Sequence, residues 1–238
     1  MALPKPETPI FELTLPSTGK NIKFRPFLVK EEKILLLAEE SDDEKQIFEA
    51  IKTIVKNCII SRVKVEDLTY FDLEYVFLQL RARSGEEFLE LLVTCKDDNE
   101  TQVSHVVNLL EIEVDTSGKS DKKIMLGKDS GIIMKYPSMK EFVKFAIMGQ
   151  NMKDPEVVDY VATLIDQVFT AEDVFDSEDQ KHEELVEYLE GLTNKQFAKI
   201  GAFFTNIPTL KYTFSVTNPN TGVESEYTLE GLRNFFDN

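Results

Sequence analysis

Residues 15–33 read LPSTGKNIKFRPFLVKEEK, and this stretch predicts a β-hairpin followed directly by the start of a helix. Apolar residues alternate with polar ones at positions 11, 13 and 15 and again at positions 22 and 24, which is typical of two strands. The residues from Pro16 to Gly19 supply the turn between them. Pro26 lacks an N–H donor, so we expect it to end the second strand or to lie at its edge.

Three helices are expected after this hairpin. Apolar residues spaced three and four apart predict the first over residues 29–40. The residues from Ser41 to Asp43 cap a second helix that ends at Cys58. The third helix covers residues 69–83, and its apolar residues form two stripes instead of one. Because a helix that is apolar on two faces lies between two layers, we expect it to be the central helix of the N-terminal half.

The rest of the chain predicts β-hairpins on either side of a helical region. Strands are expected over residues 88–95, 103–107, 109–114, 122–126, 132–137, 211–217 and 223–228. Helices are expected over residues 138–148, 154–169, 178–191, 193–204 and 229–236, so that the whole stretch from Ser138 to Phe204 is predicted to be helical.

The fold class that follows is α+β: a helical body with small antiparallel β-hairpins. It comprises an N-terminal hairpin, a central β region and a C-terminal hairpin plus short helix. We expect three regions: the N-terminal hairpin and helices in residues 1–84, a β-rich middle region in residues 85–137, and a helical region with the C-terminal hairpin in residues 138–238. A single composite domain is the alternative.

The composition limits the classes of partner. The chain has a formal net charge of −16, from 43 acidic and 27 basic residues. Its basic residues do not cluster, so nucleic acid and anionic membranes would be repelled. No apolar run approaches the roughly 20 residues that span a bilayer. Prolines interrupt the first six residues, so we do not expect the apolar core of a signal peptide there. We therefore expect a protein made and used in solution, in a reducing cytosol, with basic surfaces on its partners.

The motif that would bind zinc is incomplete. Cys95 lies at an expected hairpin tip, where a zinc ribbon places its first ligands. A ribbon needs two Cys-x-x-Cys knuckles or histidine substitutes, whereas position 98 is Asp, position 218 is Asn, and only His105 is near. The sequence therefore predicts a hairpin that folds without a metal.

No other motif carries catalytic or ligand chemistry. Cys58 is expected to be a buried, inert thiol, and neither cysteine has the orienting residue that a catalytic pair with His105 or His182 would need. The acidic run over residues 172–190 lacks the spacing and the glycine of a calcium loop. The Gly-Lys-Ser at 118–120 lacks the earlier glycine of a phosphate loop. We expect no enzyme activity, no cofactor and no small-molecule substrate.

Six residues are candidates for contacts with a partner protein: Arg25, Phe27, Arg81, Arg83, Phe235 and Phe236. The arginines at the end of the central helix complement its dipole. In the alternative interpretation they form, together with Arg25, bidentate contacts to carboxylates of a partner or of the chain itself. One ring of the terminal Phe-Phe pair is offered to another protein, or the C-terminal helix docks on its own core.

Two stretches of the chain repeat one pattern. Residues 93–103 and residues 216–223 both read as a strand, a polar turn and a strand, and a Leu-Glu segment follows each. Two copies are too few for a solenoid, so the pattern predicts at most a duplicated hairpin.

Four segments resemble the T4-type phage baseplate hub proteins: residues 15–33, 71–84, 203–210 and 229–236. They occur in order and together span nearly the whole chain. The resemblance implies a subunit of the central hub of the baseplate in contractile-tailed phages, at the tip of the tail tube. Many relatives carry Cys-x-x-Cys knuckles around positions 95 and 218, but this sequence retains only Cys95. Zinc binding is therefore not carried over.

Three functional hypotheses follow from these observations. The first is a structural, non-enzymatic hub subunit in the virion tail baseplate, assembled in the host cytoplasm, that binds other baseplate hub and tail proteins. Self-association stays open. The second is an assembly chaperone that binds hub components and does not remain in the virion. The third is an enzyme, for which the sequence offers no constellation of residues.

Overall fold

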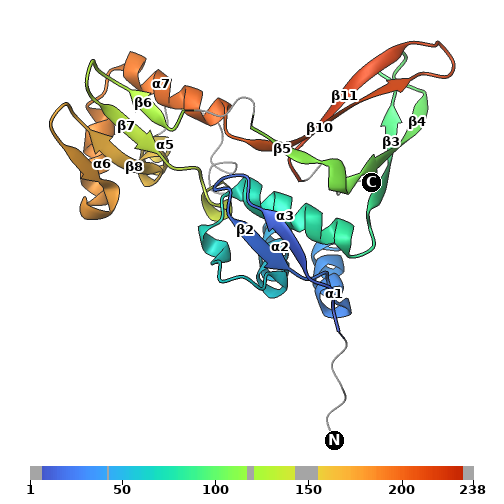
Figure 1. Ribbon diagram of the computed structural model, residues 1–238. Helices are drawn as coiled ribbons and strands as arrows, with labels where there is room; N and C mark the ends of the chain where they lie inside the picture. The colour runs from blue at the N-terminus through green and yellow to red at the C-terminus, as the bar shows by residue number, and fades with distance from the viewer. Residues whose placement is uncertain (1–6, 42, 117–120, 143–154, 233–238) are drawn as a thin grey trace, which may run out of the picture. The chain divides into compact units, whose positions relative to one another are not determined.

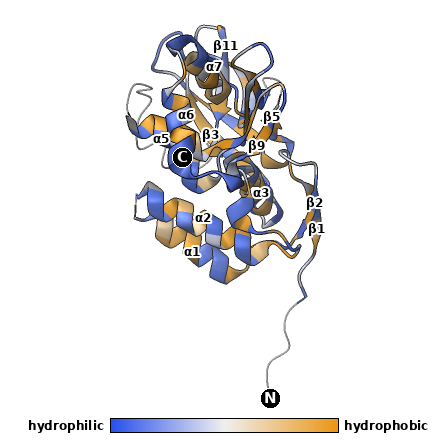
Figure 2. Cartoon of the chain, turned by 90° about the vertical axis from the view of Figure 1, so that its left-hand side faces the viewer, coloured by the Kyte–Doolittle hydropathy of each residue, from blue (hydrophilic) through white to orange (hydrophobic). Residues whose placement is uncertain are grey.

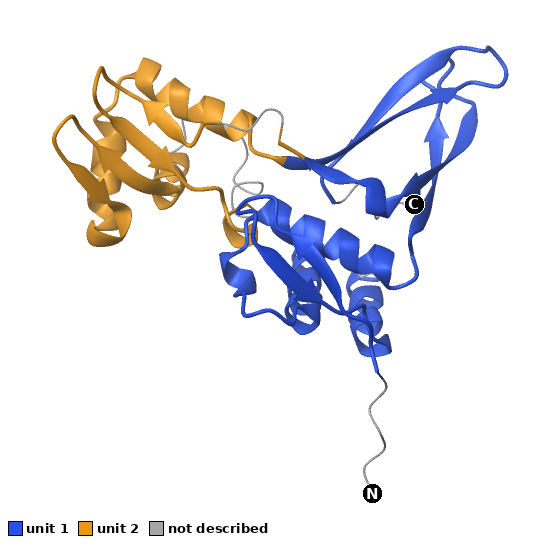
Figure 3. Ribbon diagram, in the orientation of Figure 1, with its two compact units in different colours: residues 1–114, 209–238 blue, residues 115–208 orange. Residues whose placement is uncertain are grey.

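The structure is a computed structural model that describes residues 7–41, 43–116, 121–142 and 155–232. These residues group into two compact units (Figure 3). Unit 1 comprises residues 1–114 and 209–238, and unit 2 comprises residues 115–208. This grouping differs from the three expected regions, and the division into those regions, with a single composite domain as the alternative, stays a prediction.

Unit 1 begins with the expected hairpin and three helices (Figure 1). The elements are β1 (Phe11–Thr14), β2 (Asn21–Phe24), α1 (Val29–Glu39), α2 (Glu44–Cys58), the 3-10 turn η1 (Val65–Asp67) and α3 (Tyr70–Arg83). The hairpin turn has a glycine, Gly19, at φ +69°, a conformation that costs other residues more. The side chain of Asp43 caps α2 by accepting a hydrogen bond from the Lys45 N–H, as the sequence predicts.

The amphipathic α2 packs on α3, and the alternation of hydrophobic and hydrophilic residues along α1 and α2 can be followed in Figure 2. α3 is buried on all sides, with Phe71, Val76, Phe77 and Leu80 fully buried. This confirms the two-stripe prediction that α3 is a central helix.

Two long hairpins complete unit 1. The first pairs β3 (Phe88–Thr94) with β4 (Gln102–Asn108), and the second pairs β10 (Thr209–Thr217) with β11 (Glu224–Glu230). The 3-10 turn η2 (Leu109–Glu111) leads into β5 (Glu113–Asp115), which joins the edge of β10. Figure 3 shows the two hairpins running to tips that meet. Between them, the ring of His105 stacks on the ring of Phe214 at 4.0 Å.

Unit 2 is a small antiparallel sheet packed against helices. Its strands have the order β6 (Lys123–Met125), β7 (Gly131–Met134), β8 (Ile165–Phe169) and β9 (Val174–Asp176). The other elements are α5 (Pro155–Thr163), the 3-10 turn η3 (Ser177–Asp179), α6 (His182–Glu190) and α7 (Asn194–Thr205). Gly131 is required in β7 because a Cβ there would lie 2.1 Å from the Ile124 carbonyl oxygen. The rings of Tyr136 and Phe203 stack at 5.7 Å between the sheet and α7.

The α+β class is confirmed, and so are most of the expected elements, but the stretch from Ser138 to Phe204 is not all helical. The helix expected over 154–169 ends at Thr163, and residues 165–169 form β8, which pairs with β7. β9 was not predicted, and the helix expected over 178–191 starts only at His182. At the C-terminal end, residues 229 and 230 extend β11 instead of starting a helix, and residues 233–236 of that prediction lie outside the described residues.

Two further expectations are met in part. The strand expected over 109–114 is a 3-10 turn followed by β5. Ser138 and Glu141 make the predicted capping box at the start of the helix expected over 138–148, and residues 143–148 of that prediction lie outside the described residues. Among the described helices, none combines the length and the apolar composition that crossing a bilayer requires.

Polar side chains on the buried α3 connect it to both ends of the chain. Asp72 accepts hydrogen bonds from the backbone N–H of Ser17 at 3.0 Å and from its hydroxyl, and so fixes the first hairpin turn. Glu74 accepts one from the backbone N–H of Leu232 at 3.2 Å. Its second oxygen, Oε2, has no partner among the described residues. Burial raises the pKa of Glu74 to about 7, although the Leu232 hydrogen bond opposes the shift.

This buried carboxyl predicts a pH-dependent stability that the variant Glu74→Gln removes. Above its ordinary pKa, Glu74 ionises in the unfolded chain while the folded chain keeps it neutral up to about pH 7, so stability falls across this interval. We expect Glu74→Gln to be more stable than the wild type at about pH 8, with a difference that shrinks toward about pH 4. Urea unfolding at both pH values measures it, with the exposed Glu49→Gln as control. An equal difference at both pH values would contradict the prediction.

Candidate protein-interaction site

The structure describes four of the six predicted interface residues, and three of them lie around the C-terminal end of α3. Arg81 and Arg83 are in its last turn, and Phe27 reaches it from the segment after β2. Arg25 is two residues before Phe27 and lies between β2 and the end of α2. Phe235 and Phe236 lie outside the described residues.

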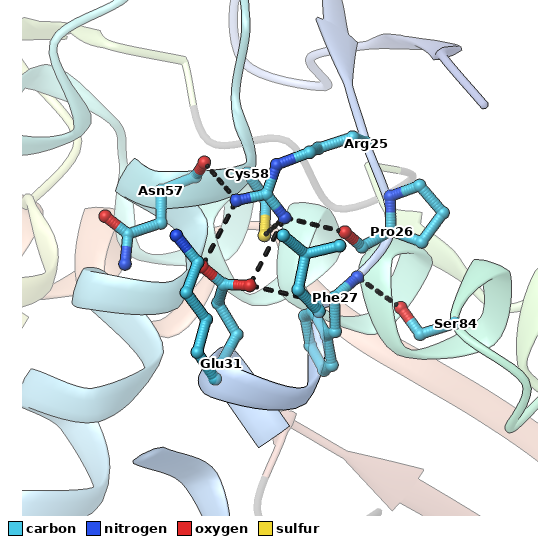
Figure 4. A network of polar contacts seen from close by, with 9 residues as sticks. Arg25, Pro26, Phe27, Glu31, Asn57, Cys58 and Ser84 are labelled. Atoms are coloured by element: carbon cyan, nitrogen blue, oxygen red, sulfur yellow. Dashed lines mark hydrogen bonds and ion pairs between the residues drawn. The ribbon is translucent and has the colours of Figure 1, made fainter. Parts of the chain in front are cut away.

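Arg25 forms a bidentate ion pair with Glu31 inside the chain (Figure 4). The two guanidinium nitrogens lie 3.1 and 3.3 Å from the two carboxylate oxygens. The Glu31 side chain is 0% exposed, and that of Arg25 is 15% exposed. The guanidinium also donates to the carbonyl oxygens of Pro26 and Asn57. Arg25 therefore connects β2, the start of α1 and the end of α2.

The place of Glu31 in the sequence explains this geometry. It is the third residue of α1, where a carboxylate is favoured by the helix dipole, and its Oε2 accepts the backbone N–H of Leu28 at 2.9 Å. The same carboxylate thus caps the helix and pairs with Arg25. Paired planar groups of this kind are among the stronger polar contacts in proteins.

The pKa values in this cluster follow from burial opposed by pairing. Burial favours the neutral form of Glu31, but the hydrogen bonds from Arg25 and Leu28 outweigh it and hold the pKa of Glu31 below its ordinary value. Burial likewise disfavours the charged form of Arg25. The hydrogen bond to Glu31 and the contacts with Cys58 outweigh this effect and raise the pKa of Arg25. The neighbouring Cys58 is buried, and desolvation raises the pKa of its thiol to about 11. A thiol with such a pKa is a poor nucleophile at neutral pH.

Phe27 anchors the chain after β2 to α3. Its backbone N–H donates to the Ser84 hydroxyl at 2.8 Å, and that hydroxyl donates to the Leu80 carbonyl oxygen. Its ring lies 5.7 Å from the ring of Phe77, which is fully buried in α3. Phe27 thus contributes to the packing of unit 1.

The two arginines of α3 also have partners in the chain. The Nε of Arg81 pairs with the carboxylate of Glu86. The guanidinium of Arg83 lies over the ring of Phe11 in β1, 5.0 Å from its centre. For Arg25 and Arg81 the structure shows carboxylates of the chain itself, one of the two alternatives in the sequence interpretation. A contact of any of these residues with a partner protein stays a prediction.

A second polar cluster joins the tips of the two long hairpins, and it was not predicted. The side-chain amide of Asn218, which is fully buried, donates to both oxygens of Asp97 at 3.1 Å and to Asp98 at 2.8 Å. The Thr221 hydroxyl donates to Asp97 at 2.6 Å, and the Asn220 amide donates to Thr101 at 3.0 Å. We call this cluster the tip junction.

The tip junction lies at the positions where the resemblance to T4-type hub proteins implies Cys-x-x-Cys knuckles, but its residues do not fit zinc. Positions 95, 98, 218 and 221 are Cys, Asp, Asn and Thr, so a single thiol is present where a structural site needs four ligands. The amide and the hydroxyl donate hydrogen bonds to carboxylates instead of offering lone pairs to a metal. Burial, together with Asp97 and Asp98, raises the pKa of the Cys95 thiol and so disfavours the thiolate that binds zinc. Among the described residues, no group of three or more His, Cys, Asp or Glu is arranged to hold a metal.

One signal in the sequence points to the tip junction. The two stretches with the same strand, turn and strand pattern, residues 93–103 and 216–223, are the two tips that meet. At both tips the chain closes the same turn, since the Asn99 N–H donates to the Cys95 carbonyl oxygen and the Gly222 N–H to that of Asn218. The repeated turn pattern in the sequence thus marks the two hairpin tips that contact each other in the structure.

A family model described as "T4 bacteriophage base plate protein" matches residues 8–237. This match covers both units and all the described elements. No curated protein and no solved structure matches the chain.

Removing Arg25 should destabilise the protein strongly, because the buried charge of Glu31 then keeps only the exposed ammonium of Lys30 as an ionic partner, 3.4 Å away. We expect Arg25→Met to lower the free energy of unfolding by about 3 kcal/mol. The double variant Arg25→Met/Glu31→Met should recover most of this loss, since neither buried charge remains. Urea unfolding at neutral pH measures both. The control is Lys23→Met, which removes an exposed ion pair with Glu12 and should cost less than about 1 kcal/mol. Equal effects of Arg25→Met and Lys23→Met would contradict the prediction.

Truncating Asn218 should separate the hairpin tips. Asn218→Ala removes the amide that pairs with Asp97 and Asp98, and we expect a loss of about 2 kcal/mol in the free energy of unfolding. The comparison is the exposed Asn220→Ala in the same turn, which removes only the single tip-junction bond to Thr101 and should cost less than Asn218→Ala. Amide hydrogen exchange should then rise at the tips of both hairpins in Asn218→Ala. Faster exchange in the β10–β11 tip alone would show that the junction does not hold the β3–β4 tip.

Proposed function

The chain belongs to the T4 bacteriophage base plate protein family, and on this premise we propose that it is a structural subunit of the central hub of the baseplate. The family membership carries the proposal, because it places the chain among phage baseplate proteins over nearly its whole length. The role is one of binding other hub and tail proteins and requires no catalytic step.

The hub, as distinct from other parts of the baseplate, is supported by the resemblance of four segments to T4-type hub proteins. Two of them, residues 15–33 and 71–84, form the turn and second strand of the first hairpin, the start of α1 and nearly all of the central helix α3. These elements make the Arg25–Glu31 pair and the buried contacts of unit 1. The resemblance therefore covers the residues that determine how unit 1 folds.

The charge of the chain supports a mechanism of assembly by complementarity. A net charge of −16 keeps separate copies apart and steers the protein toward neighbours with basic surfaces. Interfaces with such steering form quickly and in one orientation.

Quantitative mass spectrometry of purified tails beside the infected-cell lysate tests the proposal. A hub subunit should occur in the tails at a fixed copy number that matches the symmetry of the tail axis, in a constant ratio to other hub proteins. Treatment with salt at about 1 M, which screens surface charges, should not remove it from intact tails if its contacts are also apolar. Its presence in the lysate alone, bound to hub proteins and missing from tails, would overturn this role and indicate an assembly chaperone.

A further inference from the structure

The β3–β4 hairpin is covered on one face only. Alternate residues of the two strands point toward the β10–β11 hairpin, and Leu89, Leu91 and Val107 on this inner face are buried. The ring of His105 stacks on Phe214, and its Nε2 lies 3.3 Å from the Tyr212 hydroxyl. The inner face is thus part of the core of unit 1.

The outer face of this hairpin carries three exposed apolar side chains. Phe88 is 62% exposed, Leu92 is 67% exposed and Val106 is 57% exposed. Val106 lies directly opposite Glu90, so Phe88 and Leu92 are its diagonal neighbours across the strands. The three side chains therefore form one patch around Glu90. We call the patch, with Ser104, the outer β3–β4 face.

The neighbouring hairpin shows that such a patch is not a general property of unit 1. On β10 and β11 the exposed positions are polar or charged, and they alternate with partly or fully buried apolar and aromatic ones: Lys211, Thr213, Ser215, Thr217, Glu224, Glu226, Thr228 and Glu230. This is the ordinary pattern of a hairpin with one face in water. β3, with the sequence FLELLVT, instead has large apolar residues on both faces. A strand of that kind is typical of a position between two layers.

The charges near the outer β3–β4 face are almost all negative. The segment over residues 86–111 contains seven carboxylates and a single lysine, Lys96. The ammonium of Lys96 is held at the tip, 4.5 Å from the centre of the Tyr227 ring. Within the described part of the chain, no cation pairs with Glu87, Glu90 or Glu111. The patch is therefore apolar with acidic residues at its centre and its ends.

We propose that the outer β3–β4 face is the docking surface for a second baseplate protein that presents an apolar patch flanked by lysine or arginine. The proposal rests on the proposed function, which supplies a setting of neighbouring baseplate proteins. Complementary charge selects this occupant, because apolar contact at the centre combined with opposite charges at the rim is the usual anatomy of a specific interface. A second copy of the chain would bring acidic residues against acidic ones, which is unfavourable.

Site-specific crosslinking in infected cells tests this surface. The full chain, with a photo-crosslinking amino acid at position 92, is produced during infection, and the cells are irradiated and separated into lysate and purified tails. The matched control carries the same amino acid at position 36, because Leu36 on α1 is also an exposed leucine. We expect position 92 to crosslink to one phage protein with about tenfold higher yield than position 36. Mass spectrometry of the crosslinked peptide should show lysine or arginine beside apolar residues.

A charge reversal tests the electrostatic part. Glu90→Lys places a positive charge at the centre of the patch and should reduce the crosslink yield at position 92 by about tenfold. The control Glu224→Lys makes the same charge change on an exposed position of β11 and should leave the yield within about twofold. Both positions are exposed, and equal thermal unfolding midpoints of the two variants establish that the fold is intact.

The outcomes separate this inference from the proposed function. A crosslink at position 92 to a basic, apolar segment supports the inference whether it is found in tails or in lysate, while the presence of the wild-type chain in tails is decided independently. A crosslink from position 92 to another copy of the chain or to an acidic segment overturns the inference. So does a yield at position 92 no higher than at position 36 in both fractions.

Discussion

The burial of α3 on all sides is the constraint on which the rest of unit 1 depends. A helix that is buried on nearly every face needs partners for most of the polar side chains that it carries, since an unpaired buried polar group is costly. Asp72 accepts a hydrogen bond from the backbone N–H of Ser17. Of the two oxygens of Glu74, one accepts a hydrogen bond from the backbone N–H of Leu232. These two bonds bring residues near both ends of the chain to one helix. Unit 1 is therefore discontinuous in sequence, and unit 2 is inserted between β5 and β10.

The Arg25–Glu31 pair applies the same principle at the start of α1. Glu31 is fully buried. Its charge is stabilised there because its carboxylate accepts hydrogen bonds from the backbone N–H of Leu28 and from the guanidinium of Arg25. An arginine used in this way is occupied by the fold and has less capacity to bind a carboxylate on another protein. Arg81, paired with Glu86, is in a similar position. Arg25 and Arg81 thus stabilise unit 1 through carboxylates of the chain itself. The apolar side chains of the outer β3–β4 face are instead exposed.

Local patterns predicted the elements of this protein better than the contacts between them. The two apolar stripes of α3 and the cap at Asp43 are encoded within one helix, and both are found in the structure. The stretch over residues 154–169 shows the limit of such patterns, because its apolar spacing fits a helix throughout. Pairing with β7 decides that Ile165 to Phe169 form a strand, and no local signal carries that information. The tip junction is a stronger case, since Asn218 and Asp97 are 121 residues apart. The one sequence feature that the segments around Asn218 and Asp97 share is the repeated turn pattern.

The composition of the outer β3–β4 face disfavours self-association through that face. An exposed apolar patch on a hairpin with open edges is ordinarily a site of aggregation. Here Glu90 lies at the centre of the patch, and the surrounding segment is strongly acidic, so two copies that approach by this face repel each other. The same charges attract a basic surface and do not prevent apolar contact with it. One arrangement of side chains thus disfavours the wrong partner and favours a different protein, which is the property that ordered assembly of a many-component baseplate requires.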